Sequence, residues 1–387
     1  MAILISIIVY IVWGTALYSL GRDEWISTNN YYIRTGEHRK QWTSSTITIL
    51  MVLILMSAIR YRVGADCESY VEILQQGPDY WQYNRMEPLF KWIVDSFRAI
   101  YPSRVLFLGV LAALEFIPFY YAFKTRRFLY AYFGLLLILG PFYLIWQNGI
   151  RQSIASCFFV LASVMIIDDK KKILPAILVL IAAQIHASAY VFLVFLFIPV
   201  WDLFKNRYIN IAILVICAIV GQAGSEISSK LSFLANLDEI DRGGFYGNYS
   251  IEAMLGADSS MGFGPRRIIV LLLSILTIWF APKMKEFYND KYLIFSYNLF
   301  FIHTCLCENL LSNVSLMLRR PFYYTYAFEM ICFSYLLYYL YKGYKGKHNQ
   351  YLYYGAIILA SSYVIVQCVA DGGAVNETAL YKVFFLH

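Results

Sequence analysis

The segment from Trp146 to Tyr190, WQNGIRQSIASCFFVLASVMIIDDKKKILPAILVLIAAQIHASAY, decides how the chain is organised. Polar residues open the segment, an apolar run leads to the charged turn at 168–172, and a second apolar run returns to His186. Arg151 and His186 are therefore two crossings apart and share one face of the layer that the runs span. An arginine and a histidine held at one membrane face predict a functional surface there.

The composition is that of a polytopic membrane protein. The 387 residues are 60% hydrophobic and 18% aromatic, with mean hydropathy +0.56, whereas soluble domains are about half apolar. Residues 1–20 are apolar without a basic start or a small-residue cleavage pattern, so we expect a retained helix rather than a signal peptide. Among the seven cysteines only Cys305 and Cys307 are closely spaced. They would point to different faces of a helix, so neither a disulfide framework nor a zinc site is expected.

Apolar runs recur along the whole chain. A crossing needs about 20 apolar residues, and somewhat fewer in tight bundles. The runs predict an all-α bundle of about twelve transmembrane helices that forms one integral-membrane domain over residues 1–387. They fall at about 3–20, 47–59, 105–123, 128–146, 153–167, 173–185, 187–201, 209–224, 268–281, 292–307, 322–341 and 351–368.

Short basic linkers assign the two faces. Compact basic loops are expected in the cytoplasm, and here they lie at 124–127, 170–172, 205–207, 283–291 and 342–347. The chain alternates correctly when the N-terminus and the remaining linkers face outward, namely 60–104, 147–152, 186, 225–267 and 308–320.

The two faces differ in the type of basic residue more than in its amount. Under this assignment the inner loops hold 12 Lys and 6 Arg, and the outer ones hold 3 Lys and 11 Arg. Ordinary topology signals do not distinguish the two residue types. A guanidinium group binds phosphate oxygens through two parallel hydrogen bonds and stays charged when partly desolvated. The outer face is therefore expected to hold an anion.

Two outer segments have a character of their own. In the 60–104 loop, the stretch that begins at Pro88 is amphipathic, and we expect it to lie in the membrane interface as a helix with the proline in its first turn. The 225–267 loop is rich in glycine and bears aromatic residues. It is either a mobile lid whose rings stack on sugars or a disordered surface loop.

Four outward clusters are expected to converge on one cavity. They are Arg60 to Tyr70, Gln147 to Gln152, His186 to Ser188, and Arg319-Arg320. Each lies at the outer end of a crossing, where arginines can clamp a diphosphate leaving group. The alternative is that these arginines extend to lipid headgroups, as arginines at helix ends often do.

Proton transfer has two main candidates. His186 interrupts an apolar run and can accept or donate a proton near neutrality, or else it is a satisfied structural group. Asp66 follows a glycine turn beside Arg60 and Arg62, where it is either an ion-pair partner or the base that deprotonates a sugar hydroxyl. Glu87 is a further candidate for the same role.

Three blocks resemble the EpsG family of Wzy-like polysaccharide polymerases. They are RYRVGAD at 60–66 with Tyr70, GIRQSIA at 149–155, and IHASA at 185–189. A late arginine before an aromatic run, Arg319-Arg320-Pro-Phe-Tyr-Tyr, also fits, and the resemblance spans roughly residues 1–345. Cys67 departs from the pattern, because the family more often has an aromatic residue after the aspartate.

The resemblance implies a glycosyltransferase of the bacterial inner membrane with a GT-C-like helical fold and a periplasmic active site. Its substrates would be oligosaccharide repeats on undecaprenyl diphosphate, with no metal, cofactor or nucleic acid, and a chain-length regulator would be a further partner. Arg151, Arg60, Arg62 and Arg319 or Arg320 would hold diphosphate, Asp66 or His186 would activate the acceptor hydroxyl, and Glu87 and Gln152 would orient the sugar, with Tyr70 in the substrate site.

Two other classes of function stay open. A flippase for lipid-linked sugars would also need a basic, aromatic cavity, but it would need access from both faces. A membrane acyltransferase acting on surface glycans would use His186 as its base. Such enzymes load the acyl donor from the cytoplasm, where the sequence places no comparable histidine.

Overall fold

The computed structural model describes residues 1–37, 41–64, 66–170, 172–195, 200–222, 264–313, 319–342, 347–372 and 379–383. These residues form helices and no strand, apart from one isolated antiparallel bridge between Arg60 and Val383. The all-α prediction is confirmed. The expected glycine-rich loop at 225–267 falls almost entirely outside the described residues. The two alternatives for it, a lid or a disordered loop, therefore stay predictions.

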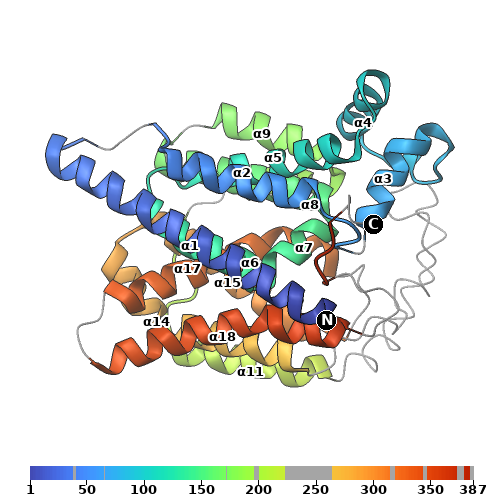
Figure 1. Cartoon of the computed structure of the whole chain (residues 1–387). Helices are drawn as coiled ribbons and strands as arrows, with labels where there is room; N and C mark the ends of the chain where they lie inside the picture. The colour runs from blue at the N-terminus through green and yellow to red at the C-terminus, as the bar shows by residue number, and fades with distance from the viewer. Residues whose placement is uncertain are drawn as a thin grey trace. The chain divides into compact units, whose positions relative to one another are not determined.

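Figure 1 labels the helices of the chain. The chain divides into two compact units, residues 1–200 with 334–387 and residues 201–333. Unit 1 contains α1 (Ala2–Thr35), α2 (Ser44–Ala58), α3 (Cys67–Gln76), α4 (Pro88–Ile100), α5 (Arg104–Ala122), α6 (Tyr130–Leu139), α7 (Phe142–Asn148), α8 (Ile150–Asp168), α9 (Ile173–Ala183), α10 (Phe192–Phe195) and α18 (Lys347–Asp371). Unit 2 contains α11 (Arg207–Gln222), α14 (Pro265–Tyr288), α15 (Lys291–His303), the π-helix η6 (Thr304–Leu310) and the 3₁₀ segment η7 (Arg320–Thr325). The boundary between the units falls within α17 (Tyr326–Lys342).

Five described helices are long and apolar enough to span a membrane, namely α1, α5, α8, α14 and the part of α18 from Gln350. A sixth span results if the 67° bend between α6 and α7 lies within one crossing. The predicted multi-pass membrane protein is therefore confirmed, but the count of twelve is not. The expected crossing at 187–201 starts as the 3₁₀ segment η4 (Ala187–Val191) and the four-residue α10, and residues 200–206 are not helical.

Close helix packing explains how unit 1 holds together. Helix α1 lies along α6, and Gly21 and Gly134 allow the two backbones to approach. A Cβ atom on Gly21 would lie 2.3 Å from the Ala131 nitrogen, and one on Gly134 would lie 2.7 Å from the Leu17 Cβ. Small residues at such contacts are typical of helices that pack inside a membrane.

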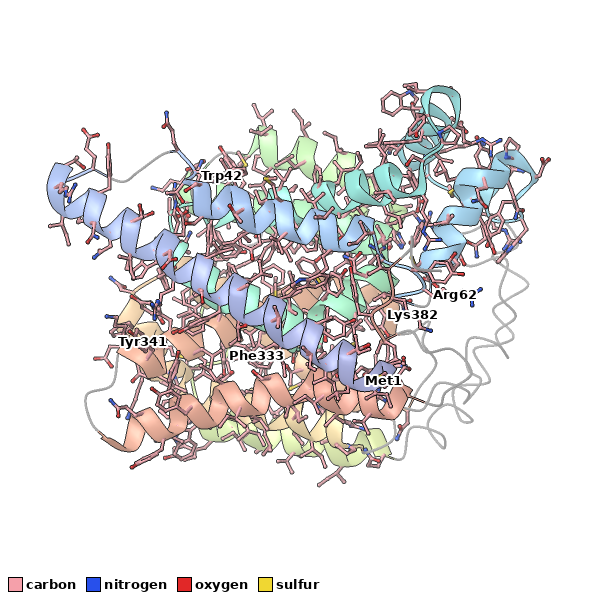
Figure 2. The ribbon with its side chains drawn as sticks, viewed as in Figure 1. Met1, Trp42, Arg62, Phe333, Tyr341 and Lys382 are labelled. Carbon is pink, nitrogen blue, oxygen red and sulfur yellow. The ribbon has the colours of Figure 1, made fainter. Side chains whose placement is uncertain are left out.

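The two ends of unit 1 collect different linkers. At one end, Arg126 donates hydrogen bonds of 2.5 and 2.9 Å to Asp168, and Arg127 pairs with Glu24. The other end carries α3 and α4, and Figure 2 shows Arg62 there and Trp42 at the opposite end. The basic 124–127 loop and the 168–172 turn thus share one end, as their alternation with the polar clusters predicted.

Candidate active site

Arg151 lies in the first turn of α8, directly after the corner at Gly149. Its Nη1 donates a 2.6 Å hydrogen bond to Oε2 of Glu87. The guanidinium carbon lies 5.4 Å from the centre of the Phe90 ring, within cation–π distance. The side chain keeps 24% of its surface exposed. Arg151 is therefore both paired and accessible to a ligand.

Glu87 links three segments of unit 1. It stands immediately before Pro88, which begins α4 and fixes the direction of that helix. One carboxylate oxygen receives the bond from Arg151 in α8, and the other accepts a 2.8 Å bond from the backbone nitrogen of Ala187. The backbone nitrogens of Leu89 and Phe90 donate to the Gln184 carbonyl, which ties the start of α4 to the end of α9. The carboxylate is thereby held in one position.

His186 lies beside this carboxylate. It has an extended backbone and directly precedes η4. Its Nδ1 is 3.6 Å from Oε1 of Glu87 and 3.2 Å from the Ser188 hydroxyl oxygen. The first distance is too long for a hydrogen bond, but a carboxylate this close stabilises an imidazole that has taken up a proton. The His186 side chain is 28% exposed, so it can exchange protons with a bound substrate.

Tyr70 and Asp66 approach the same place from α3. The Asp66 side chain is exposed, and its backbone nitrogen donates a 3.1 Å bond to the Asn148 side chain at the end of α7. Tyr70 is buried with its ring centre 6.0 Å from that of Phe90, and Arg151 and Asp66 are its charged neighbours. Burial raises the pKa of Tyr70, so its hydroxyl stays protonated and can donate a hydrogen bond.

Gly64 sets the distance between the 60–66 loop and the corner between α7 and α8. Its φ is +86°, and a Cβ atom there would lie 2.8 Å from the carbonyl oxygen of Gln147. Only glycine accepts both the left-handed backbone and the close approach without strain. The glycine predicted to form a turn before Asp66 therefore also presses that turn against the residues that precede Arg151.

Arg62 and Glu68 form the exposed edge of the site. Arg62 is exposed with φ +56°, and its backbone nitrogen donates to Glu68. Both oxygens of Glu68 accept from Arg104, with Nη–Oε distances of 2.6 and 2.9 Å. Burial opposes ionisation of Glu68, but the bonds and charge of Arg104 keep its pKa below the usual value. The sequence interpretation had not singled out Arg104, although it follows Ser103, the residue that caps α5.

Arg60 occupies an inner position rather than the outward-facing one that the sequence predicted. Only 1% of it is exposed, and its Nη1 donates to the Ser57 carbonyl at 2.7 Å. The C-terminal segment covers it, because Tyr61 donates its backbone N–H to the carbonyl oxygen of Lys382, and Val383 bridges to Arg60. A contact between residues more than 300 positions apart is not visible in the local sequence.

The three remaining predicted residues lie in different parts of the chain. Gln152 is half-buried in α8, next to Arg151. Arg319 lies in unit 2, where it is 2% exposed at the start of the 3₁₀ segment η7. The side chain of Arg320 lies outside the described residues.

Within unit 1 the structure brings together three of the four predicted clusters. The blocks around Asp66, Arg151 and His186 meet at Glu87 and Phe90. The sequence interpretation missed Phe90 and the Ala187 backbone N–H, and it gave Glu87 no place in a cluster. The pattern Glu-Pro at the start of an amphipathic stretch was the available signal, because a residue before a helix-starting proline has a fixed, extended backbone.

This arrangement gathers a guanidinium group, a carboxylate and an imidazole in one place. A guanidinium group offers donors to phosphate oxygens. A histidine and a carboxylate within reach of each other can take a proton from a hydroxyl. The buried tyrosine ring and Phe90 give the site an apolar wall beside the exposed aspartate.

The family model for the EpsG family matches residues 45–382, which is most of the chain. No curated protein and no solved structure matches the chain. The match starts after α1 and extends to the C-terminal segment that covers Arg60, beyond the limit near residue 345 expected from the motifs. With a family model covering most of its length, the chain belongs to the EpsG family.

Proposed function

We propose that the protein is a polysaccharide polymerase of the O-antigen type. It transfers a growing glycan from undecaprenyl diphosphate onto the terminal sugar of a lipid-linked repeat unit, at the outer face of the inner membrane. Membership of the EpsG family supports a polymerase of this general kind in a membrane. The contact of Arg151, Ala187 and His186 with the one carboxylate of Glu87 is the observation that carries the proposal.

In the proposed reaction the bond between the anomeric carbon of the donor glycan and its diphosphate breaks. A new bond forms between that carbon and the acceptor hydroxyl oxygen, and undecaprenyl diphosphate leaves. Arg151, with Arg62, neutralises the charge that develops on the diphosphate, and buried Arg60 supports the loop that carries Arg62. His186 or Asp66 takes the proton of the acceptor hydroxyl.

The other predicted residues have orienting roles in this scheme. Glu87 holds Arg151 and His186 at a fixed separation, which lowers the entropic cost of aligning the two substrates. Tyr70 donates a hydrogen bond from its hydroxyl to a substrate oxygen, and Gln152 contacts the sugar. The lipid-linked donor supplies the diphosphate leaving group, and a side chain supplies the base. The scheme therefore needs no nucleotide sugar.

The test is a reconstitution of the full-length protein in liposomes with lipid-diphosphate repeat units as the sole substrate. Polymer of increasing length with release of undecaprenyl diphosphate is the expected result. Movement of intact lipid-linked units to a protected compartment without polymer would indicate a flippase. Product formed only after an acyl donor is added would indicate an acyltransferase, and either of these results would overturn the proposal.

A further inference from the structure

Unit 2 contains a π-helical turn, η6, that continues directly from α15. The backbone nitrogen of Leu311 donates a 2.8 Å bond to the carbonyl oxygen of Leu306, five residues earlier. In an ordinary α-helix, a residue five positions on is rotated by about 140° around the axis. A π-turn returns it to the same side, and such turns are frequent at functional sites. The turn therefore brings together side chains five positions apart, which an α-helix would separate, beside those four positions apart, which an α-helix already aligns.

His303, Cys307 and Glu308 are the side chains gathered here. One nitrogen of the histidine, the cysteine sulfur and one glutamate oxygen all lie within 4.8 Å of one another. His303 and Cys307 are fully buried, and the Glu308 side chain is 16% exposed. Nitrogen, thiolate and carboxylate ligands in one place are a typical set for zinc.

The hydrogen bonds of His303 assign its proton. Its Nδ1 lies 3.0 Å from the Phe322 carbonyl oxygen and 3.0 Å from the Thr325 hydroxyl oxygen. A carbonyl oxygen only accepts, so in the neutral ring the proton is on Nδ1. This leaves Nε2 with a lone pair, and a backbone carbonyl that orients the ring in this way is the usual support of a metal-bound histidine.

The lone pair of Nε2 has no hydrogen-bond partner among the described residues, although the atom is buried. It faces Oε1 of Glu308 at 3.5 Å. Two acceptors that face each other repel unless a proton or a cation lies between them. The thiol of Cys307 beside this gap favours a cation with affinity for sulfur.

The charged neighbours of the cluster are compatible with such a cation. Arg267 and Arg319 act on Glu308 and oppose a further positive charge. Glu329 is fully buried, and neither of its carboxylate oxygens has a hydrogen bond among the described residues. The charge of Glu329 interacts with that of Glu308, so Glu329 is an acidic group that can offset the positive charge of a bound cation.

We propose that Nε2 of His303, Sγ of Cys307 and a carboxylate oxygen of Glu308 form a site for Zn²⁺ or a similar sulfur-binding divalent cation. Three protein ligands leave a fourth position of a tetrahedron for water or another ligand. The site holds the end of α15 and the π-turn in register, and it is independent of the polymerase proposal. The sequence predicted no metal site and gave His303 and Glu308 a helix-packing or interface role. His303 and Cys307 have the four-residue spacing of one helix face, but Glu308 joins them only through the π-turn.

The experiment uses the full-length protein, purified in detergent with a tag that contains no histidine, stripped with a chelator and titrated with Co²⁺. One Co²⁺ per chain should bind, with a thiolate-to-Co²⁺ charge-transfer absorption, and Zn²⁺ should displace it. Cys307→Ser should abolish that absorption and weaken binding by more than the roughly 100-fold that loss of a supporting group can cost. Cys305→Ser, two residues away in the same turn, is the matched control and should keep both signals.

Several results would overturn the site. They are the lack of saturable Co²⁺ binding to wild type, a charge-transfer absorption that survives in Cys307→Ser, or its loss in Cys305→Ser. If Cys307→Ser does not elute as a single folded species, Glu308→Gln replaces it. That variant should keep the absorption but bind Co²⁺ about 10- to 100-fold more weakly, and unchanged affinity would also refute the proposal.

Discussion

Among the described residues of unit 1, three arginine–glutamate pairs have a 2.6 Å contact. Two of them, Arg127 with Glu24 and Arg151 with Glu87, differ clearly in burial. The side chains of the first pair are 1% and 0% exposed, and those of the second are 24% and 15% exposed. The surroundings of the first pair are also more enclosed than those of the second. The first pair lies between helices at the end of the unit near Trp42, and the second lies where loops and helix starts meet.

The hydrogen-bond partners explain what each pair can do. Arg127 also donates to the Gln41 carbonyl, and Glu24 also accepts from the hydroxyl of Thr43. These partners all lie within the unit, so the pair joins α1 to the loop before α6. Glu87 instead shares its charge among Arg151, a backbone N–H and a histidine. Equal ion-pair distances therefore do not mean equal roles. The functional pair, Arg151 with Glu87, is distinguished from the structural pair by its exposure and by a carboxylate that has several partners.

The largest effect is expected at the buried pair. Glu24→Gln leaves the Arg127 charge without its counter-ion in the interior and should cost about 3–5 kcal/mol of stability. Thermal unfolding of the purified variant and its abundance in membranes measure this loss. The polymerisation rate per folded molecule should stay near wild type. A large fall in that rate with normal stability would show that the buried pair belongs to the site.

The next effect is expected at the exposed pair. Arg151→Lys keeps the charge but loses the guanidinium geometry, and it should reduce polymerisation by about 10²- to 10³-fold. Cells with this variant should carry single unpolymerised repeats, which gel analysis of the glycan reveals. Arg127→Lys is the matched control, and its folded fraction should polymerise normally. A normal polymer ladder from Arg151→Lys would remove Arg151 from the site.

A smaller effect is expected in the loop that carries Asp66. Gly64→Ala should lower the free energy of unfolding by about 1–3 kcal/mol, since it forces a left-handed alanine against the Gln147 carbonyl. Activity should also fall, because the loop that carries Asp66 is displaced. Gly36→Ala is the control, because Gly36 has φ +69° but no atom within 4 Å of an added Cβ. The difference between the two variants, in unfolding and in rate, isolates the contact with Gln147. Equal effects would mean that this contact does not position the site.

The smallest effect is expected at the edge of the site. The pKa of Glu68 is below its usual value in the folded protein, so its stabilising contribution is present above the unfolded pKa of about 4.3. It is lost as the pH falls through the lower folded pKa. Wild type should therefore lose more thermal stability in acid than Glu68→Gln does. Parallel acid unfolding curves for the two proteins would contradict this.

Much of the site was predictable because its residues belong to local motifs. The Arg-Gln and His-x-Ser blocks each adjoin an apolar run, and the alternation of crossings requires Arg151 and His186 to lie at one end. Glu87 was harder to place, because its partners are 64 and 100 positions away. The predicted crossing at 187–201 could not be tested by composition alone, since apolarity there does not specify whether the backbone continues as a helix.

The sequence by itself determined that the protein is a helical membrane protein and which linkers share an end, because hydrophobic runs and charge patterns act over about one helix length. Only the tertiary structure decided which charges are buried. Arg60 is covered by a segment more than 300 residues away, and a change from α to π winding places His303 beside Glu308. Both outcomes depend on packing and backbone hydrogen bonding between distant or specially wound segments, which residue type alone does not encode.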